Sequence, residues 1–307
     1  MKRIAMGLGF VALLWPGLVF AACVVRQRAG VTLDVVDSVI LAPVAVNGIP
    51  GLFILDTGAA MTVVTPDAVR RLGISLDEWT ATTMLGVGGI ERRRNAKPRS
   101  VELGGVALRR RSLARDQTLR VATLARVTVG NQTIDGLLGR DLLSAFDLAL
   151  DAKQRSLVLY DVRGCAGRFL PWLEAYSSIP VENPAESALV VSVELDGVRL
   201  RALLDSGATQ TLVAAPGMAR LGLGLDRLSG DPNQFVSGMG PHTVTMWHHR
   251  FREFRVGADT IGAPSFLVAP IQLTPISDML LGADWFAGRK VWISYATNQL
   301  FVTEPGR

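Results

Sequence analysis

Residues 53–64 read FILDTGAAMTVV, and residues 202–213 read ALLDSGATQTLV. The two stretches share an aspartate, a small hydroxyl residue, a glycine, an alanine and a later threonine at the same offsets. At average residue frequencies, a second copy of such a pattern arises by chance in roughly one chain in a thousand. We therefore interpret the two stretches as copies of one segment.

The sequence before and just after each copy repeats as well. Each copy follows two alternating apolar stretches joined at Asn47 or Asp196, each with glycine next, which is a strong hairpin signal. A short helix is expected after each copy, opening with an early proline and ending at Gly73 or Gly222.

Further landmarks recur later in each half. Glycine-rich stretches lie at 85–90 and 237–241, and Leu-Leu-Gly-x-Asp segments lie at 137–141 and 280–284. A hairpin pattern closes each half. Landmarks that recur in one order predict a duplicated domain.

Composition and pattern bound the fold class. The chain has 307 residues, 49% hydrophobic and 19% charged, which fits a globular protein of two domains. Strand-like stretches with few helices predict an all-β fold. We expect an N-terminal lobe at 23–166, a proline-containing linker at 167–187 and a C-terminal lobe at 188–307.

Residues 1–22 have the layout of a secretory signal peptide. Lys2 and Arg3 precede an apolar run at 4–20, and small residues Ala21 and Ala22 follow. A retained membrane anchor is the alternative. The signal-peptide interpretation predicts a secreted, periplasmic protein.

The two cysteines, Cys23 and Cys165, allow two interpretations. In an oxidising compartment an even pair favours a disulfide. Alternatively Cys23 carries a lipid, because the residues before it loosely resemble a lipoprotein cleavage site. Contact with a membrane is expected only in the lipidated case.

The net charge of +5 comes mainly from arginines at 92–94, 109–111 and 250–255. Stacking aromatic residues are not interleaved with them, so we expect no nucleic-acid partner. We interpret these runs as a solvated face, and attraction to an acidic envelope surface or substrate stays open.

The repeated aspartates, Asp56 and Asp205, carry the chemistry. Each ends an apolar strand, and a pseudo-twofold packing of the two halves would bring the two carboxyl groups together. Two such groups in contact hold one proton between them, and so supply a general base and a general acid. The pair can activate a water for attack on a peptide carbonyl without a metal, a cofactor or a covalent intermediate.

Other candidate sites are weaker. His248 and His249 would point to opposite faces of a strand, so they do not suit one metal, and with His242 we expect them at the surface. Cysteine and histidine spacings of zinc sites are missing from the sequence. Trp285 and Trp292 are expected in the core.

The sequence resembles the retropepsin and pepsin clan of aspartic peptidases, most closely the bacterial periplasmic retropepsin-like proteins. The resemblance covers about residues 31–302 and rests on 55–59, 204–208, 137–139 and 280–282. It implies two similar retropepsin-like β-barrel lobes related by a pseudo-twofold axis, with a catalytic cleft between them.

The resemblance also implies roles for single residues. The catalytic pair would be Asp56 and Asp205. Support of their turns would fall to Thr57, Gly58, Ser206 and Gly207. The strands that thread past the turns would end at Gly139 and Gly282. Flaps over the substrate would include Gly86, Val87, Gly88, Gly89, Gly238, Met239 and Gly240.

This chain departs from the pepsin pattern in two ways. Ala59 and Ala208 stand where pepsin-like enzymes have a hydroxyl residue, which predicts a weakly acidic rather than strongly acidic optimum. Neither glycine-rich stretch has the flap tyrosine, and both halves can form a flap. Since both lobes lie in one chain, no obligate dimer is expected.

The sequence thus predicts a single-chain aspartic endopeptidase that cuts extended protein segments in the cell envelope. A preference for apolar residues beside the cleaved bond is a clan-level expectation. Two alternatives stay open: a peptide- or protein-binding module on the same fold, and a protease that processes only itself.

Overall fold

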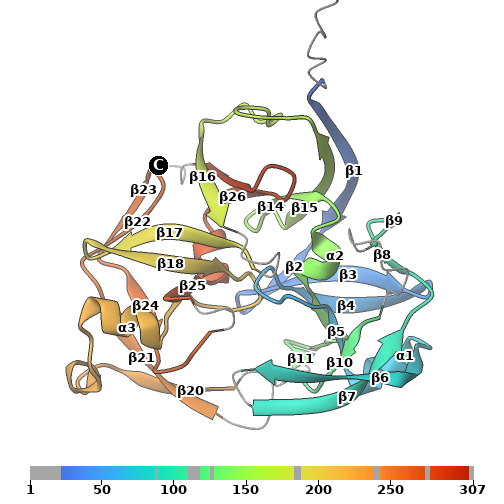
Figure 1. The fold of residues 1–307 in the computed structure, drawn as a ribbon, viewed down its shortest axis with the longest axis horizontal. Coiled ribbons are helices and arrows are strands. Elements are labelled where there is room, and N and C mark those ends of the chain that lie inside the picture. The colour runs from blue at the N-terminus through green and yellow to red at the C-terminus, as the bar shows by residue number, and fades with distance from the viewer. Residues whose placement is uncertain are drawn as a thin grey trace, which may run out of the picture.

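The computed structural model describes residues 22–86, 89–109, 118–124, 128–182, 188–237, 243–273 and 277–303. Strands dominate this part of the chain, and the helices are short, so the all-β prediction is confirmed. Two similar lobes lie side by side, and a third sheet spans one end of the molecule (Figure 1).

The first lobe is a sheet in the order β10-β5-β13-β4-β3-β8-β9, with β2 beside β3. Its elements are β2 (Asp34–Val36), β3 (Val39–Val46), β4 (Ile49–Leu55), β5 (Val63–Val64), α1 (Pro66–Arg71), β8 (Val101–Leu103), β9 (Val106–Ala107), β10 (Arg120–Val121), β13 (Gly136–Leu138) and α2 (Arg140–Leu143). Two hairpins project from it: β6 (Ser75–Gly86) with β7 (Gly89–Lys97), and β11 (Thr128–Val129) with β12 (Gln132–Thr133).

The second lobe repeats this plan. Its elements are β17 (Val190–Leu195), β18 (Val198–Leu204), β19 (Leu212–Val213), α3 (Ala215–Leu221), the 3₁₀ helix η2 (Leu225–Leu228), β20 (Asn233–Ser237), β21 (Thr243–Arg250), β22 (Glu253–Val256), β23 (Asp259–Gly262), β24 (Ser265–Val268), β25 (Met279–Leu281) and α4 (Ala283–Phe286).

Local chemistry fixes the hairpins and helices where the repeats predict them. Asn47 and Asp196 adopt left-handed backbone angles, φ 54° and 52°, in the turns that join β3 to β4 and β17 to β18. The Thr65 side chain caps α1 by accepting from the backbone N–H of Ala68, 3.1 Å away. Gly222, at φ 61°, ends α3 in the conformation that glycine adopts most readily.

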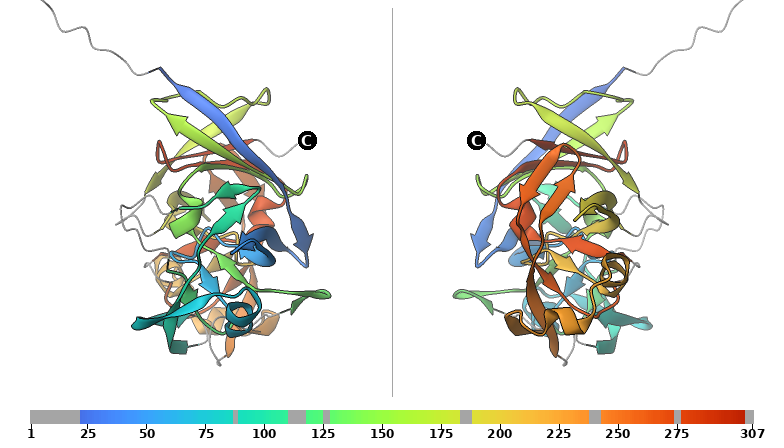
Figure 2. Two further views of the ribbon diagram at one scale, coloured as in Figure 1. Left: turned by 90° about the vertical axis from the view of Figure 1, so that its right-hand side faces the viewer. Right: turned by 90° about the vertical axis from the view of Figure 1, so that its left-hand side faces the viewer.

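A sheet shared by the two lobes joins them. It contains β1 (Val24–Thr32), β14 (Asp147–Asp151), β15 (Ser156–Arg163), β16 (Tyr176–Glu182), β26 (Lys290–Ser294) and β27 (Gln299–Thr303), in the order β1-β15-β14-β26-β27-β16. The antiparallel pair β14–β26 is the junction, with Leu148 opposite Ile293. This sheet lies at the end of the molecule opposite the hairpins β6–β7 and β20–β21 (Figures 1 and 2).

One expectation from the sequence needs correction. The stretch 167–187 is not simply a linker, because β16 lies within it and pairs with both β27 and β17. Buried Ile179 and Val181 alternate with exposed Ser178 and Pro180, which is the pattern of a half-buried strand. Residues 183–187 of the expected linker lie outside the described residues.

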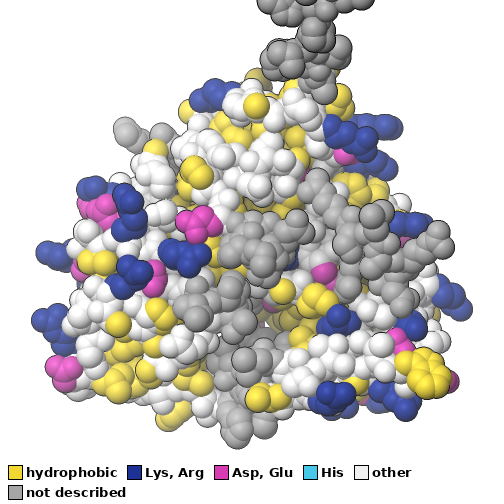
Figure 3. Space-filling view, viewed as in Figure 1, with side chains coloured by type: hydrophobic (Ala, Val, Ile, Leu, Met, Phe, Trp, Pro, Cys, Tyr) yellow, Lys and Arg dark blue, Asp and Glu magenta, His cyan; other side chains and the backbone are white. Residues whose placement is uncertain are grey.

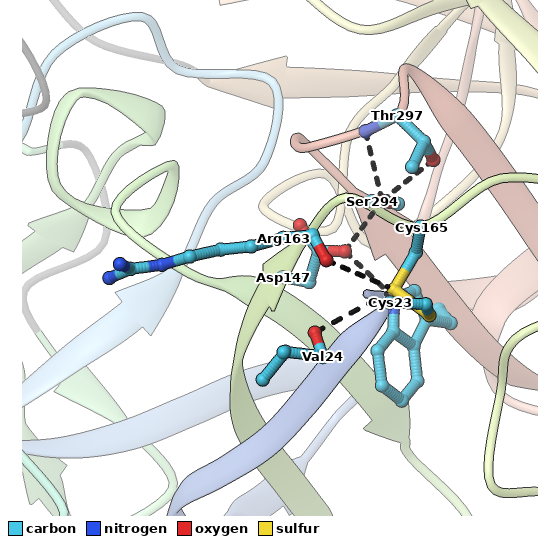
Figure 4. The surroundings of a disulfide bond; sticks show 8 residues. Cys23, Val24, Asp147, Arg163, Cys165, Ser294 and Thr297 are labelled. Atoms are coloured by element: carbon cyan, nitrogen blue, oxygen red, sulfur yellow. Dashed lines mark hydrogen bonds between the residues drawn. A yellow bond between two sulfur atoms is a disulfide. The ribbon is translucent and has the colours of Figure 1, made fainter. Parts of the chain in front are cut away.

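Of the two interpretations open for the cysteines, the structure contains the favoured one, and the two tryptophans lie in the core as expected. A disulfide joins Cys23 to Cys165 and ties the start of β1 to the end of β15 (Figure 4). Trp285 and Trp292 are buried, with 4% and 0% of their surface exposed, so their prediction as core residues is confirmed.

The expected signal peptide falls almost wholly on residues 1–21, which lie outside the described residues. Across the part of the chain that the structure describes, helices long and apolar enough to span a membrane are not found.

Candidate active site

The two repeated aspartates each follow a strand that runs parallel to a Leu-Leu strand. β4 pairs with β13, and β18 pairs with β25. The backbone N–H of Asp56 donates to the Leu138 carbonyl over 3.1 Å, and that of Asp205 donates to the Leu281 carbonyl over 2.9 Å. The Leu-Leu-Gly segments therefore hold the turns that carry the aspartates.

Reciprocal hydrogen bonds lock the two turns together. The backbone N–H of Thr57 donates to Ser206 Oγ, and that of Ser206 donates to Thr57 Oγ1, each over 3.1 Å. Both hydroxyls donate back across the interface, Thr57 to the Leu204 carbonyl (2.9 Å) and Ser206 to the Leu55 carbonyl (2.7 Å). This exchange relates the lobes by a pseudo-twofold axis and explains why both motifs need a hydroxyl residue.

Glycine at Gly58 and Gly207 lets each carboxyl group approach the opposite turn. A Cβ added to Gly58 would lie 2.5 Å from Asp205 Cγ, and one added to Gly207 would lie 2.4 Å from Asp56 Cγ. Such distances are not available to a side chain. The structure thus places Asp56, Asp205, Thr57, Gly58, Ser206 and Gly207 in one constellation.

Both carboxyl groups are buried and accept backbone N–H groups of their own turns, and burial raises the pKa of each. Burial, followed by repulsion from Asp205, raises the pKa of Asp56 well above the ordinary 3.8. Burial also raises the pKa of Asp205, but the N–H groups of Ala208 and Gly207, each 3.1 Å from its Oδ1, oppose that rise. The pKa values of both groups are therefore raised, as expected for two buried carboxyl groups that share a proton.

A second pair of contacts braces each turn from behind. Thr62 Oγ1 donates to Asp141 Oδ1 over 2.6 Å and accepts from the Gly139 N–H over 3.0 Å. Thr211 Oγ1 likewise donates to Asp284 Oδ1 over 2.8 Å and accepts from the Gly282 N–H over 3.2 Å. The sequence showed these threonines and aspartates as repeated positions but assigned them no role.

The glycines of the Leu-Leu-Gly segments make room for the backbone of the motif. A Cβ on Gly139 would lie 2.6 Å from the carbonyl carbon of Met61. One on Gly282 would lie 2.4 Å from that of Gln210. Close backbone approach therefore requires glycine at both positions.

Asp135 and Asp278 are a further pair of matched residues to which the sequence analysis assigned no role. Each buried carboxylate accepts the backbone N–H of a neighbouring strand, from Leu52 or Arg201, over 2.8 Å. Each also pairs with an arginine near the end of a helix, Arg71 of α1 or Arg220 of α3. Both aspartates stand just before the matching strands β13 and β25, and this repeated position could have identified them from the sequence.

Two hairpins stand in the places expected of flaps. Gly86 and Gly89 face each other at the end of β6–β7. The other expected flap residues, Val87, Gly88, Gly238, Met239 and Gly240, lie outside the described residues. Met84 of β6 packs against an apolar cluster with Ala59, and Val236 and Val244 of β20–β21 pack against one with Ala208.

The two described histidines are not at the surface as expected, because His248 and His249 are both partly buried. His249 is partly buried, and its Nδ1 lies 2.6 Å from Asp231 Oδ2, whereas the sequence predicted a surface position. His242 lies outside the described residues. Among the residues that are described, groups of His, Cys, Asp or Glu that could hold a metal are not found.

Comparison with known proteins agrees with this geometry. The profile of a family described as aspartyl protease matches residues 42–142 and 191–285, one stretch in each lobe. Curated proteins gave no match. Among solved structures, the aspartic proteinase from Irpex lacteus matches with a TM-score of 0.53 at 13% identity, covering 93% of this chain and 98% of that chain. This likeness shows the two-lobed fold.

Proposed function

The chain belongs to the aspartyl protease family, and from that premise we propose that it is an aspartic endopeptidase whose catalytic pair is Asp56 and Asp205. The proposal rests on the close approach of the two carboxyl groups, which the reciprocal hydrogen bonds between Thr57 and Ser206 hold in place. A pair held this closely and partly buried shares one proton, which supplies an acid and a base together.

The difference in pKa suggests the role of each partner. Ionised Asp205 takes a proton from a water, and the water oxygen attacks the peptide carbonyl carbon. Protonated Asp56 gives its proton to the carbonyl oxygen, which completes a neutral tetrahedral diol. The diol then collapses: Asp205 protonates the leaving nitrogen, the C–N bond breaks, and Asp56 recovers a proton from the diol oxygen.

The surroundings of the pair suggest the substrate class. An extended protein segment would lie beneath β6–β7 and β20–β21 and add its backbone as a strand. Met84, Val236 and Val244 belong to apolar clusters that include the alanines next to the motif glycines. Apolar side chains beside the cleaved bond would bury surface there, which is a favourable contribution to binding.

The disulfide supports a secreted, periplasmic location in the cell envelope. Disulfides persist in oxidising compartments and are rare in the cytosol. With its sulfur bonded to Cys165, Cys23 has no thiol left to carry a lipid. We therefore propose a protein that is not anchored through Cys23.

Cleavage of a mixed peptide library between about pH 3 and 8 tests the proposal. We expect cleavage by the wild type and none by Asp56→Asn or Asp205→Asn, because the pair acts as a unit. Glu78→Gln removes an exposed carboxylate outside the site and should keep wild-type activity. Mass measurement of each purified protein would show any cleavage of its own chain.

Three results would contradict the proposal, and each points to a different alternative. Folded wild type that cuts no peptide at any pH would contradict the proposal and favour the binding module. Cleavage that persists in either Asp→Asn variant would exclude the pair as the catalytic groups. Cleavage confined to the protein's own chain would favour self-processing.

A further inference from the structure

A pocket of about 350 Å³ lies in the second lobe, and none of its residues belongs to the proposed catalytic site. It is bounded by the β17–β18 turn, the end of α3, η2 and the end of β21 with the residues after it. Its charged and polar side chains are Asp196, Arg227, His249 and Arg252. The volume falls in the range of small-molecule sites in proteins.

The duplicated first lobe shows how the same place can be filled. There Asn47, the counterpart of Asp196, accepts the Arg99 N–H with Oδ1 over 2.6 Å. Its amide nitrogen donates to the carbonyls of Leu72 and Gly73 at the end of α1, over 3.1 and 2.9 Å. One amide side chain thus ties the hairpin turn to the end of the helix.

The second lobe keeps half of this arrangement. Asp196 Oδ1 accepts the N–H groups of Arg252 and Glu253 over 2.7 and 3.0 Å. A carboxylate, however, has no N–H to donate to the carbonyls that end α3. The turn and the helix are therefore not tied by this residue, and the pocket opens between Asp196 and Leu221.

Substitutions around the pocket also change its charge. Counting from the matched Arg99 and Arg252, Ala96 of the first lobe corresponds to His249 of the second. Counting from the glycines that follow α1 and α3, Glu78 corresponds to Arg227. The second lobe therefore has a cation where the first has an anion, and an imidazole where the first has a methyl group.

These side chains leave positive charge facing the pocket. Arg252 lies 3.5 Å from the Asp196 carboxylate, which offsets that anion. The Nδ1 atom of His249 lies 2.6 Å from Asp231 Oδ2, which fixes the orientation of the ring. Within the described residues, the Arg227 side chain has no ion pair or hydrogen bond. On this side of the molecule, beside the β17–β18 turn, Lys and Arg side chains lie interspersed with Asp and Glu side chains (Figure 3).

We propose that this pocket binds a small oxyanion, a phosphate or a carboxylate, through Arg227 and Arg252. A guanidinium presents a planar fork of N–H donors that matches both groups. The bound anion would bridge η2, through Arg227, and the segment between β21 and β22, through Arg252, which also lies beside Asp196 of the β17–β18 turn. The proposal is independent of the peptidase activity.

Calorimetric titration with inorganic phosphate, and separately with succinate, at constant ionic strength tests the proposal. We expect saturable binding of at least one anion to the wild type, about tenfold weaker in Arg227→Gln, since a hydrogen bond to a charged group contributes about 1.5 kcal/mol or more. Arg199→Gln removes an exposed arginine of β18 outside the pocket and should leave affinity unchanged. The tighter of the two anions identifies the ligand class.

The Asp196→Asn variant tests whether the anion binds in a defined pocket or is only attracted by the positive charge of the surface. Its amide can donate to the end of α3, as Asn47 does to α1, so we expect the pocket to close and binding to weaken. Removal of a negative charge alone would tighten binding, and that result would overturn the proposal. It would also be overturned if neither anion bound saturably, or if Arg227→Gln bound as tightly as Arg199→Gln.

Discussion

At the scale of single residues, two nearly identical motifs produce two different carboxyl groups. Asp56 Oδ1 lies 2.7 Å from the Ala59 N–H, whereas Asp205 Oδ1 accepts both Gly207 and Ala208. Hydrogen bonds to the charged form favour it. The backbone donors of both turns therefore oppose the rise in pKa that burial causes.

The raised pKa of Asp56 predicts a pH-dependent stability difference. A group whose folded pKa exceeds its unfolded value stabilises the fold at low pH, and that stabilisation is lost as pH rises through the folded pKa. Asp56→Asn cannot ionise. We expect its free energy of unfolding to exceed that of the wild type at pH 7, by about 1 kcal/mol or more, and the gap to close as pH falls below 3.8.

Urea unfolding of the two proteins from about pH 3.5 to 7 measures this difference. Titrating groups other than Asp205, which is coupled to Asp56, are common to both proteins and cancel. Parallel curves for the wild type and Asp56→Asn would contradict the assignment of the proton to Asp56. Glu78→Gln, at an exposed position, should follow the wild type.

Gly58→Ala tests the close approach of the two turns. The added methyl would meet Asp205 Cγ at 2.5 Å, so we expect loss of peptidase activity and destabilisation of about 1–3 kcal/mol. Gly230→Ala is the matched control, because a Cβ there meets nothing within 4 Å. Activity assays and urea unfolding measure both effects, and wild-type activity in Gly58→Ala would refute the geometry.

The alanines after the motif glycines predict the position of the pH optimum. A serine hydroxyl at Ala59 and Ala208 could donate to the adjacent carboxylate and lower its pKa. One such bond of about 1.5 kcal/mol corresponds to about one pH unit. We expect the optimum of the double Ser variant to move toward acid by about that much in a profile of kcat/KM. Ala60→Ser, at an exposed neighbour, should not move it.

At the scale of elements, a hydrogen bond joins each motif turn to the start of a short helix. Thr62 bonds to Asp141 of α2, and Thr211 bonds to Asp284 of α4. Both threonines are buried, with 0% and 1% of their surface exposed, and each serves as donor and acceptor. Their hydroxyls therefore link the motif turn, the Leu-Leu-Gly glycine and the following helix.

Thr62→Val and Thr211→Val should each destabilise the fold by about 1–3 kcal/mol. Valine keeps the shape of threonine but leaves the N–H of Gly139 or Gly282 unpaired, which is costly in a buried place. We also expect kcat to fall, because the turn that carries the aspartate is no longer braced. Thr260→Val, on exposed β23, is the control and should stay within about 0.5 kcal/mol of the wild type.

At the scale of the whole molecule, the shared sheet makes the lobes one unit. Asp147 of β14 is buried, and it accepts Trp292 Nε1 (3.2 Å) and Ser294 Oγ (2.5 Å) of β26. The Ala296 N–H also donates to it over 3.0 Å. First-lobe and second-lobe residues are thus hydrogen-bonded directly, at the end of the molecule away from the hairpins.

The disulfide should stabilise this shared sheet substantially. Cys23 and Cys165 are 142 residues apart, and a cross-link that closes a long loop restricts the unfolded chain strongly. We expect the Cys23→Ser/Cys165→Ser variant to lose about 2–5 kcal/mol, measured by urea unfolding under oxidising conditions. Reduction of the wild type should give the same loss and leave the double variant unchanged. A variant as stable as the oxidised wild type would contradict the prediction.

The sequence by itself determined the duplication, the all-β class, the hairpin turns at Asn47 and Asp196 and the two aspartates. These features are local, because strand alternation and turn chemistry act between neighbouring residues. The duplication also shows each pattern in two places in the sequence. The strand β16 escaped detection because Pro180 within it, with Pro171 and Pro184 on either side, masked a short buried alternation.

Only the tertiary structure decided how distant residues meet. Thr57 and Ser206 are 149 residues apart, and the proton preference of the carboxyl pair depends on their approach and on burial, which no local pattern encodes. The same holds for the pocket at Asp196. The change from asparagine to aspartate was visible in the sequence, but its effect required the end of α3 to lie opposite the turn.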